Sequence, residues 1–362
     1  MTLHIVEPTL TNYAGHCHSL VNTIVQAAPE KNVIVWAGKG SEKFWNSKVT
    51  LKPFFFKAIR RLQVFFLYQR LLDSPDKILI ATAGTLDFFM IDLAAGKKVE
   101  SGKVFLFVHW IGFKKDKINK LAKLAKRQPN LKVLCPTEAG AGFFRDLGFS
   151  ADFVPYPQNG SDCVQQQGQK FKQLIVAGAA RIDKGFPKIV DLVVELQKSD
   201  SQLPISVQIS TTHKLKHSNE ILYQIDRLKK CHYPRLTLIE NSLSPDTYFD
   251  MFVGAISVQP YLVGDFQNRV SGVTLDALMA GCPVVVTADT WLSEIVLEHN
   301  AGVATADLSP AGLKNAIDRI LIDYEGYSNR ALTAGKVLKI AHSGEKMIEI
   351  IFDNSIDSKL FL

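Results

Sequence analysis

Short apolar runs alternate with longer helical patterns along the first half of the chain. Apolar stretches bounded by polar turns predict buried strands, and apolar residues repeated every three or four positions predict helices. The expected strands cover residues 3–6, 33–36, 77–81, 104–108, 131–134 and 152–154. One expected helix begins at Gly15, and others cover residues 59–72, 86–95, 117–127 and 139–147. This alternation is typical of parallel βαβ units and therefore of a Rossmann-like sheet.

A second series of the same kind follows a polar segment. Residues 158–170 are polar, contain glycine and lack periodicity, which predicts a linker between domains. Strands are expected at residues 173–177, 205–209, 236–239, 255–258 and 283–286. Helices are expected at residues 186–197, 219–230, 245–251, 272–281, 310–322, 328–340 and 345–352. We therefore expect one domain over residues 1–157, a second over residues 171–340, and a terminal helical segment over residues 341–362.

Composition agrees with a soluble two-domain protein. The 362 residues are enough for two domains of ordinary size, and 47% hydrophobic and 21% charged residues are usual for globular proteins. No apolar run approaches the roughly 18 residues of a membrane-spanning helix. The first residues do not follow the pattern of a signal peptide, so we expect a cytoplasmic protein. The five cysteines are scattered, which favours reduced thiols over disulfides or a zinc site.

Charge is divided unevenly between the two halves. The net charge is +7, with +9 over residues 1–168 and −2 over residues 169–362. A basic domain attracts anionic partners. Nucleic acid and an anionic membrane surface are both candidates on charge alone.

Two segments of the second domain carry the most informative polar residues. In the first, Arg181 and Lys184 lie between a predicted strand and helix, beside small residues that let the backbone approach a ligand. Cations near a helix N-terminus suit a diphosphate whose bond to another group is breaking. The second segment, residues 268–287, is a polar turn followed by a helical pattern, a glycine and an apolar strand. It carries Asn268 in the turn and Asp276 in the helix.

Together these segments resemble the donor site of nucleotide-sugar glycosyltransferases of the GT-B fold, especially retaining glycosyltransferase family 4. Asn268 and Asp276 stand at the family's two acidic positions, and Lys184 with Gly185 matches its Lys-Gly pair. Arg181 is a displaced equivalent of the family's Arg, three residues before the Lys instead of five. The resemblance is strongest over about residues 170–305. It implies an α/β protein with two Rossmann-like domains facing a central cleft, and a C-terminal helix that crosses back to the first domain.

The resemblance also implies roles for single residues of the donor site. Asp276 would bind the ribose, and Asn268 would contact the donor sugar without acting as a base, because an amide has no titratable group. Arg181 and Lys184 would stabilise the leaving diphosphate. The other residues implied in donor binding are the backbone amides of Val270, Ser271 and Gly272, and the turn at Gly15. A solvated basic turn, a surface aspartate and an ordinary tight turn are the alternatives from the residues themselves.

The first domain offers candidates for the acceptor side. His109 and Trp110 follow a predicted strand, and the family often has a His there that touches the transferred sugar or the acceptor. A core histidine packed under Trp110 is the alternative. Glu138 is a further candidate at the rim, while Thr137 before it also suits a helix N-cap. The chain contains no Asp-x-Asp triplet, so we expect metal-independent catalysis without a cofactor other than the donor.

Two basic stretches of the first domain suggest contact with a membrane. Residues 54–66 mix aromatic residues with cations, and residues 114–127 place lysines at threefold spacing. Either stretch fits a helix on anionic lipid headgroups, at the inner membrane face, or a solvated surface helix. Lipid-linked acceptors in the resembled family favour the membrane over nucleic acid.

The expected function is that of a hexosyltransferase. It moves a sugar, with retention, from a nucleotide diphosphate-sugar to a glycan, lipid-linked or protein-linked acceptor. The alternatives are a hydrolase or epimerase of the nucleotide sugar, and a non-catalytic protein that binds it; Asn268 in place of an acid is the main argument for the last. The sugar, the base and the acceptor stay open.

Overall fold

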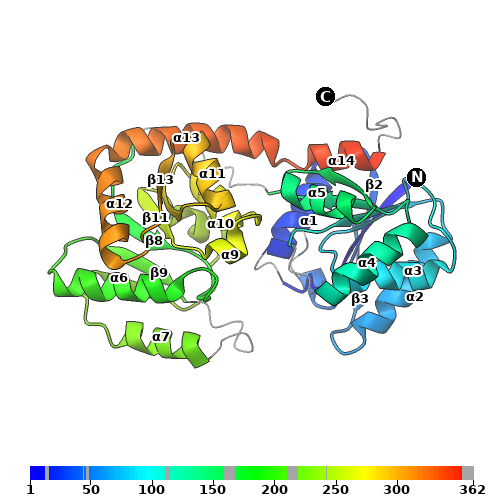
Figure 1. Ribbon diagram of the computed structural model, residues 1–362, viewed down its shortest axis with the longest axis horizontal. Helices are drawn as coiled ribbons and strands as arrows, with labels where there is room; N and C mark the ends of the chain where they lie inside the picture. Colours follow the sequence, from blue (N-terminus) through cyan, green and yellow to red (C-terminus); the bar gives the residue numbers. More distant parts are fainter. Residues whose placement is uncertain are drawn as a thin grey trace. The chain divides into compact units, whose positions relative to one another are not determined.

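The computed structural model describes residues 1–12, 16–43, 45, 49–110, 115–158, 168–209, 219–241 and 243–352. The chain divides into two compact units (Figure 1). Unit 1 comprises Met1–Asn159 and Ala341–Leu362, and unit 2 comprises Gly160–Ile340. None of the helices in the described part of the chain has the length and hydropathy needed to cross a bilayer. Gly15 and most of the predicted linker lie outside the described residues.

Unit 1 contains a parallel sheet with helices on both faces. Its strands are β1 (Thr2–Glu7), β2 (Asn32–Gly38), β3 (Thr50–Phe55), β4 (Lys77–Ile80), β5 (Val104–Phe107), β6 (Lys132–Cys135) and β7 (Ser150–Phe153). Its helices are α1 (His16–Gln26), α2 (Arg60–Leu72), α3 (Thr85–Ala95), α4 (Lys115–Arg127), α5 (Glu138–Asp146) and α14 (Glu345–Phe352), with a 3-10 turn η1 (Ser41–Lys43). The strand order is β3-β2-β1-β4-β5-β6-β7, so the order reverses direction between β1 and β4.

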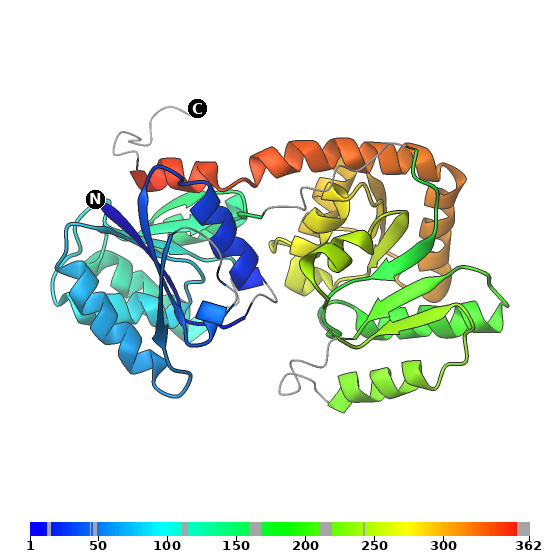
Figure 2. The ribbon, with the colours of Figure 1, turned by 180° about the vertical axis from the view of Figure 1, so that it is seen from behind.

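The core of unit 1 explains which helices cover which face. Val64 and Leu67 of α2, Phe88 of α3 and Phe144 of α5 pack with the buried side chains on one face of the sheet. Helices α1 and α14 contact each other on the other face, which Figure 2 shows from behind. Crossovers that run in opposite directions from β1 place their helices on opposite faces, because each crossover is right-handed.

Strand β3 was not predicted from the sequence. It lies at the edge of the sheet and pairs only with β2 among the described strands. Pro53 within it cannot donate to a neighbouring strand, and such a residue is tolerated at an edge. The register also shifts between Ala37 and Gly38 of β2, opposite this proline. The proline and the cations around it conceal the strand pattern.

Unit 2 repeats the architecture with a parallel sheet in the order β10-β9-β8-β11-β12-β13. Its strands are β8 (Gln173–Val176), β9 (Ile205–Gln208), β10 (Leu236–Ile239), β11 (Ala255–Gln259), β12 (Val284–Thr287) and β13 (Gly302–Thr305). Its helices are α6 (Phe186–Lys198), α7 (Asn219–Lys229), α8 (Pro245–Asp250), α9 (Val263–Phe266), α10 (Gly272–Met279), α11 (Trp291–Glu298), α12 (Pro310–Ile322) and α13 (Tyr324–Ala341). The sequence did not predict α9, α11 or β13.

The helices of unit 2 divide between two buried clusters. One cluster joins α6, α7 and α12 to the sheet, and the other joins α10, α11 and α13. The order of the strands reverses between β8 and β11, and in open α/β sheets ligands bind at the carboxyl ends of strands at such a point. The prediction of an α/β protein with two Rossmann-like domains is therefore confirmed.

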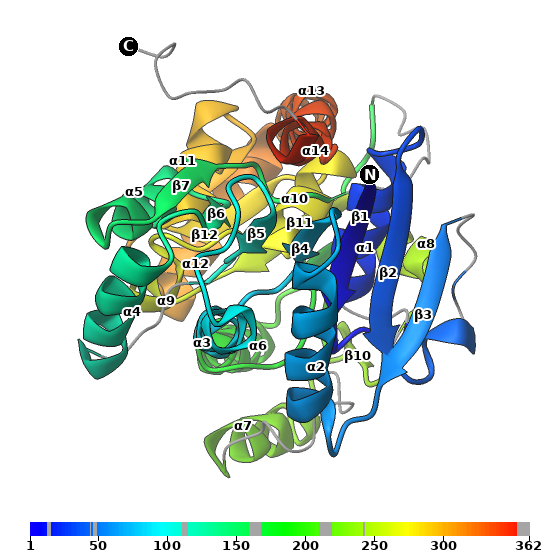
Figure 3. The same cartoon turned by 90° about the vertical axis from the view of Figure 1, so that its right-hand side faces the viewer.

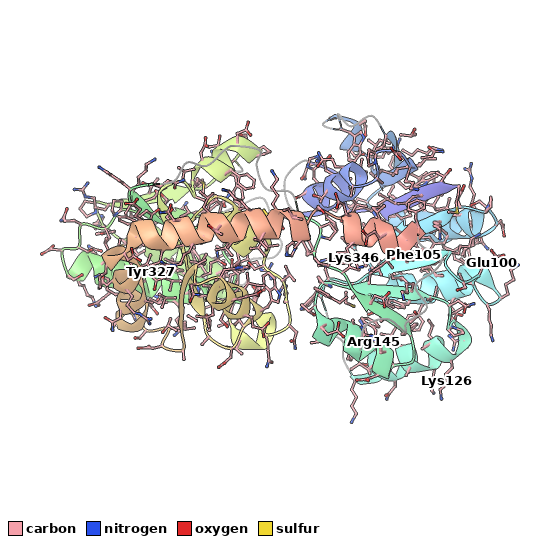
Figure 4. All side chains as sticks on the ribbon, turned by 90° about the horizontal axis from the view of Figure 1, so that it is seen from above. Glu100, Phe105, Lys126, Arg145, Tyr327 and Lys346 are labelled. Atoms are coloured by element: carbon pink, nitrogen blue, oxygen red, sulfur yellow. The ribbon has the colours of Figure 1, made fainter. Side chains whose placement is uncertain are left out.

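Close packing of α13 fixes the end of α10. A Cβ on Gly335 of α13 would lie 2.4 Å from the carbonyl oxygen of Leu278. Gly281 ends α10 with φ +69°, and its carbonyl accepts a hydrogen bond of 2.8 Å from the Ser328 hydroxyl. Tyr327, labelled in Figure 4, lies beside Ser328 near the start of α13. The helix that carries Asp276 is therefore held at its C-terminal end by contacts within unit 2.

The chain re-enters unit 1 through His342. The Nδ1 of this buried side chain donates to the carbonyl of Tyr156 at 2.7 Å, and the amide of Gln158 donates to the carbonyl of His342 at 2.9 Å. The two stretches of chain that join the units thus lie side by side within unit 1. Burial lowers the pKa of His342, so the ring is neutral in the folded protein.

Candidate functional site

The loops after β8 and β11 meet where the strand order of unit 2 reverses. Gly178, just after β8, has φ +94° and donates its amide to Oε1 of Gln208 at 2.7 Å. Gly185 begins α6 with φ +67°, and a Cβ there would lie 1.9 Å from the carbonyl oxygen of Pro260. Glycine is therefore needed at 185 both for the left-handed backbone and for the contact between the two loops.

Lys184 lies at the centre of this meeting point. A Cβ on Gly178 would lie 2.8 Å from its Nζ, and the same Nζ lies 5.3 Å from the centre of the Tyr261 ring. Loss of water around the ammonium, helped by the charge of Arg181, lowers the pKa of Lys184 to about 8. Asp183 and Asp276 act in the opposite direction. A lysine whose pKa is shifted by burial and by neighbouring charges, at the point where the strand order reverses, is a candidate ligand-binding residue.

Asp183 links the two arginines of the site. Nε of Arg181 donates to Oδ1 of Asp183 at 2.7 Å, and the second guanidinium nitrogen pairs with Oδ2. Arg269 donates to the same Oδ2 at 3.2 Å, and its guanidinium lies 4.8 Å from the centre of the Phe266 ring. Burial and the charge of Arg181 both lower the pKa of Arg269. The loop after β8 and the turn before α10 are thus joined by an Arg-Asp-Arg bridge.

The start of α10 is firmly anchored. Ser271 is the N-cap, and its hydroxyl accepts from the amide of Thr274. The buried hydroxyl of Thr274 donates to Gln259 at 2.6 Å, which ties the helix to the end of β11. A Cβ on Gly178 would lie 3.6 Å from the Val273 side chain, so the first turn of α10 faces the loop that carries Lys184. The first amides of a helix are favourable anion donors. Of the predicted residues, Val270, Ser271 and Gly272 belong to this start.

Asp276 faces inward from the second turn of α10. Its side chain is 9% exposed, and Oδ2 accepts from the Tyr248 hydroxyl at 3.1 Å. Burial and the charge of Asp276 raise the pKa of Tyr248, so this phenol is a neutral donor. Asp276 is also close enough to Lys184 to influence its pKa. The structure thus brings the predicted carboxylate and the predicted lysine to one place, and Asp276 is not a surface residue.

Asn268 lies in the same turn but differs in exposure. Its side chain is exposed, whereas the neighbouring Arg269 is half-buried in the bridge to Asp183. An exposed amide at this position can hydrogen-bond a hydroxyl but cannot take a proton.

His109 and Trp110 follow β5 in unit 1. The His109 ring packs against Phe107 and Tyr156, with ring centres 6.2 Å apart in both pairs. Trp110 is 52% exposed, whereas His109 is partly buried. His109 lies in an aromatic cluster at the carboxyl end of the strand.

Thr137 and Glu138 open helix α5. The Thr137 hydroxyl accepts from the amide of Gly140 at 3.1 Å, so the N-cap reading of Thr137 is confirmed. Glu138 is exposed and pairs with Arg145 of the same helix, a residue labelled in Figure 4. Its carboxylate points into solvent and already has a cation as partner.

Glu7 is a buried carboxylate that the sequence analysis did not single out. It ends β1, is fully buried, and accepts from the hydroxyls of Thr9 and Thr82 and from the amide of Thr9 at 3.0 Å. Burial raises its pKa. These bonds join the loop after β1 to the loop after β4, where the order of strands in unit 1 reverses. The sequence offers one signal for this site: Glu7 is a charged residue at the end of an apolar strand, directly before Pro8.

The arrangement in unit 2 suits an anion with an attached polyol. Three cations and the N-terminal amides of α10 can hold phosphates, while Asp276 can accept hydroxyl groups. The negatively charged carboxylate of Asp183 holds Arg181 and Arg269 in place, so less ordering of these side chains is needed when a ligand binds. No described residue of the site has to move a proton for such binding.

Comparison with known proteins identifies the fold. No protein-family model matches the chain, and no curated protein sequence matches it. Similar solved structures include HepE of Anabaena in complex with UDP-glucose, at 13% identity and a TM-score of 0.70, covering 96% of this chain and 98% of that one. Sucrose-phosphate synthase of Thermosynechococcus elongatus has 13% identity and a TM-score of 0.67, with 97% and 96% covered. WaaG, a glycosyltransferase involved in lipopolysaccharide biosynthesis, has 14% identity and a TM-score of 0.64, with 97% and 99% covered.

These similarities extend over nearly the whole chain and concern the fold. The GT-B fold predicted from the sequence is therefore confirmed.

Proposed function

We propose that the chain is a glycosyltransferase that takes a sugar from a nucleotide diphosphate-sugar. The observation that carries the proposal is the position of Lys184. It lies against Gly178 at the reversal point of the unit 2 sheet, beside two arginines and a buried aspartate. Solved proteins of the same fold include one with UDP-glucose bound, which favours a nucleotide sugar as the ligand.

Each residue of the site has a task in this reaction. Lys184, with the amides at the start of α10, binds the diphosphate and stabilises the charge that develops as the bond to the sugar breaks. Arg181 and Arg269 add positive charge from their bridge on Asp183. Asp276 accepts the ribose hydroxyls, and Asn268 contacts the sugar.

The finer features of the reaction are also part of the proposal. Transfer proceeds with retention. It needs no metal ion, because cations of the protein take the place of a divalent metal on the diphosphate. The acceptor is a glycan, lipid-linked or protein-linked molecule, bound by unit 1, where His109, Trp110 and Glu138 are the candidate contacts. Gly15, which the sequence analysis assigns to a turn, is a further proposed contact to the donor phosphates.

Two alternatives use the same site, and the exposed amide at Asn268 is the argument for the first. A protein that binds the nucleotide sugar without turning it over would need the same cations and Asp276 but no acid at 268. A hydrolase or epimerase would act on the nucleotide sugar without an acceptor. Both alternatives share the binding site with the transferase. The first forms no product, and the second forms a product without an acceptor.

A panel of nucleotide sugars tests the proposal. Thermal shift with UDP-, GDP-, ADP- and TDP-sugars should reveal one base that raises the melting temperature, because a ligand that binds the folded state stabilises it. The preferred sugar is then incubated with and without an extract that supplies acceptors. Release of nucleoside diphosphate only with the extract supports transfer, whereas release without it supports hydrolysis. Binding without release supports the non-catalytic alternative if the sugar is unchanged, and an epimerase if the sugar is altered. No binding by any member refutes the donor site.

A further inference from the structure

One face of unit 1 exposes large apolar side chains that the core does not use. Phe56, Ile59, Leu62 and Phe66 are 51%, 49%, 63% and 62% exposed. They belong to the turn after β3 and to helix α2, which lies beside α3 on the outside of the sheet (Figure 3). We call these four residues, with the cations around them, the apolar–basic face.

Helical spacing places these side chains together. Ile59, Leu62 and Phe66 are three and seven positions apart and therefore share one side of α2. The opposite side carries the buried residues of the helix: Val64, Leu67, Tyr68 and Leu71. Folding thus requires only one side of α2 to be apolar. The second apolar side has no role in the core of unit 1.

Phe56 is held in a fixed position relative to the helix. Its amide donates to Oε1 of Gln63 at 2.7 Å, and Nε2 of Gln63 donates to the carbonyl of Phe54 at 2.9 Å. The amide of Ile59 also donates to the carbonyl of Phe56 at 3.1 Å. The turn and the first half of α2 therefore form one rigid surface, and little ordering is needed when this surface binds a partner.

The charge around these apolar residues is mainly positive. Lys57, Arg61 and Arg70 are exposed, and Nζ of Lys39 lies 5.3 Å from the centre of the Phe56 ring. Over residues 44–73 the chain carries six lysines and arginines and one acidic residue, the exposed Asp73 at the end of α2. Aromatic and aliphatic residues surrounded mainly by cations are complementary to an anionic surface with an apolar layer beneath it.

Helix α4 gives a comparison within the same unit. It is the most lysine-rich helix pattern of the first domain, yet its exposed residues are all charged or polar, from Lys115 to Arg127. Its large apolar residues, such as Leu121 and Leu124, are buried. Lys126, labelled in Figure 4, is one of its exposed cations. This helix can attract anions but has nothing to insert into a bilayer.

We propose that the apolar–basic face docks unit 1 on an anionic lipid bilayer. The side chains of Phe56, Leu62 and Phe66 enter the boundary between headgroups and acyl chains, and Lys57 and Arg70 bind lipid phosphates. A protein partner fits less well, because charged residues are depleted in the cores of protein interfaces, whereas here several cations and one carboxylate, Asp73, lie around the apolar residues. The proposal depends only on the surface of unit 1, so it stands or fails separately from the donor site.

Flotation with phospholipid vesicles tests the proposal on the full chain. Wild-type protein should float with vesicles of phosphatidylcholine containing 30% phosphatidylglycerol, and much less with phosphatidylcholine alone. The Leu62→Ser/Phe66→Ser variant should lose at least tenfold in partitioning to the anionic vesicles. The matched control, Leu222→Ser/Tyr223→Ser on α7, alters side chains that are 53% and 59% exposed and should stay within twofold of wild type.

A second pair of variants separates local from overall charge. Arg70→Glu, four positions after Phe66 on the same side of α2, should weaken partitioning by about fivefold or more, since a basic residue at the surface of an anionic membrane contributes about 1 kcal/mol. Lys123→Glu on α4 changes the net charge equally and should have less than half that effect. Because all these side chains are exposed, thermal melting should stay unchanged and confirm that the variants are folded.

Three results would overturn the proposal. The first is wild-type protein that does not float with anionic vesicles. The second is equal loss for Arg70→Glu and Lys123→Glu, which would leave only a general charge effect. The third is a dimer in light scattering that Leu62→Ser/Phe66→Ser dissociates, which would assign the face to a second copy of the chain.

Discussion

Replacing Lys184 with alanine removes the cation at the centre of the donor site. Lowering the pKa of an ammonium from 10.5 to about 8 raises the free energy of its charged form by about 3 kcal/mol, at 1.36 kcal/mol per pKa unit. A bound diphosphate returns much of this free energy through charge-assisted hydrogen bonds, which contribute about 1.5–3 kcal/mol. We therefore expect Lys184→Ala to weaken binding of a nucleoside diphosphate about 10- to 150-fold.

Titration calorimetry with UDP, GDP and ADP measures this change, and pH gives it a signature. A terminal phosphate is already ionised above pH 7, because its second pKa is about 6. Wild-type affinity should therefore fall as the pH rises from 7 to 9 and Lys184 loses its proton. In Lys184→Ala that fall should disappear.

Lys188→Ala is the matched control, because Lys188 is an exposed lysine in the first turn of α6, four positions after Lys184. Its dissociation constant should match that of the wild type. An unchanged dissociation constant in Lys184→Ala would refute the placement of the diphosphate. An equal pH dependence of binding in wild type and Lys184→Ala would refute it as well.

Four further predictions concern other parts of the site and the fold. Asp276→Ala should weaken nucleotide binding by about 1–3 kcal/mol by calorimetry, whereas Asn268→Ala should change turnover and leave diphosphate binding nearly intact; normal behaviour of both would move the donor site elsewhere. Turnover should survive EDTA, and loss restored by manganese or magnesium would contradict this. Gly185→Ala should lower the urea midpoint, because its Cβ meets Pro260 at 1.9 Å and its φ is +67°; an unchanged midpoint would mean that the loops adjust freely. The folded-state pKa of His342 lies below the usual 6.5, so the unfolded state takes up its proton first and the free energy of unfolding falls as the pH drops below about 6.5. The slope should be shallower in His342→Gln, and an equal slope would exclude His342 as a source.

Much of the fold could be predicted because its signals are local. The apolar runs of β1, β8 and β12 are buried strands, and the helix of residues 310–322 has the predicted bounds. The elements that were missed have mixed signals. β3 contains Pro53 and alternates poorly, and α11 is a helix of only two turns directly after a strand. In both, tertiary packing outweighs the local pattern.

The candidate site likewise contains residues that the sequence could identify and residues that it could not. Lys184 and Gly185 could be singled out, since a cation followed by glycine at a strand-to-helix turn is a pattern within a few residues. The residues that hydrogen-bond to the predicted ones could not be identified from the sequence. Asp183 reaches Arg269 across 86 positions of sequence, and Tyr248 reaches Asp276 across 28. Such contacts depend on how the strands are ordered in the sheet, and no spacing in the sequence records that order.

The central claim is that the site around Lys184 and Asp276 supports transfer of a sugar from a nucleotide diphosphate. The most direct test is a phosphorus NMR time course of the preferred nucleotide sugar with wild-type protein and an acceptor extract. We predict that the resonances of the nucleotide sugar are replaced by those of the nucleoside diphosphate only when acceptor is present, and that a Lys184→Ala/Asp276→Ala variant leaves them unchanged. A nucleotide sugar that binds wild-type protein and persists with every acceptor extract, or equal conversion by the double variant, would contradict the account.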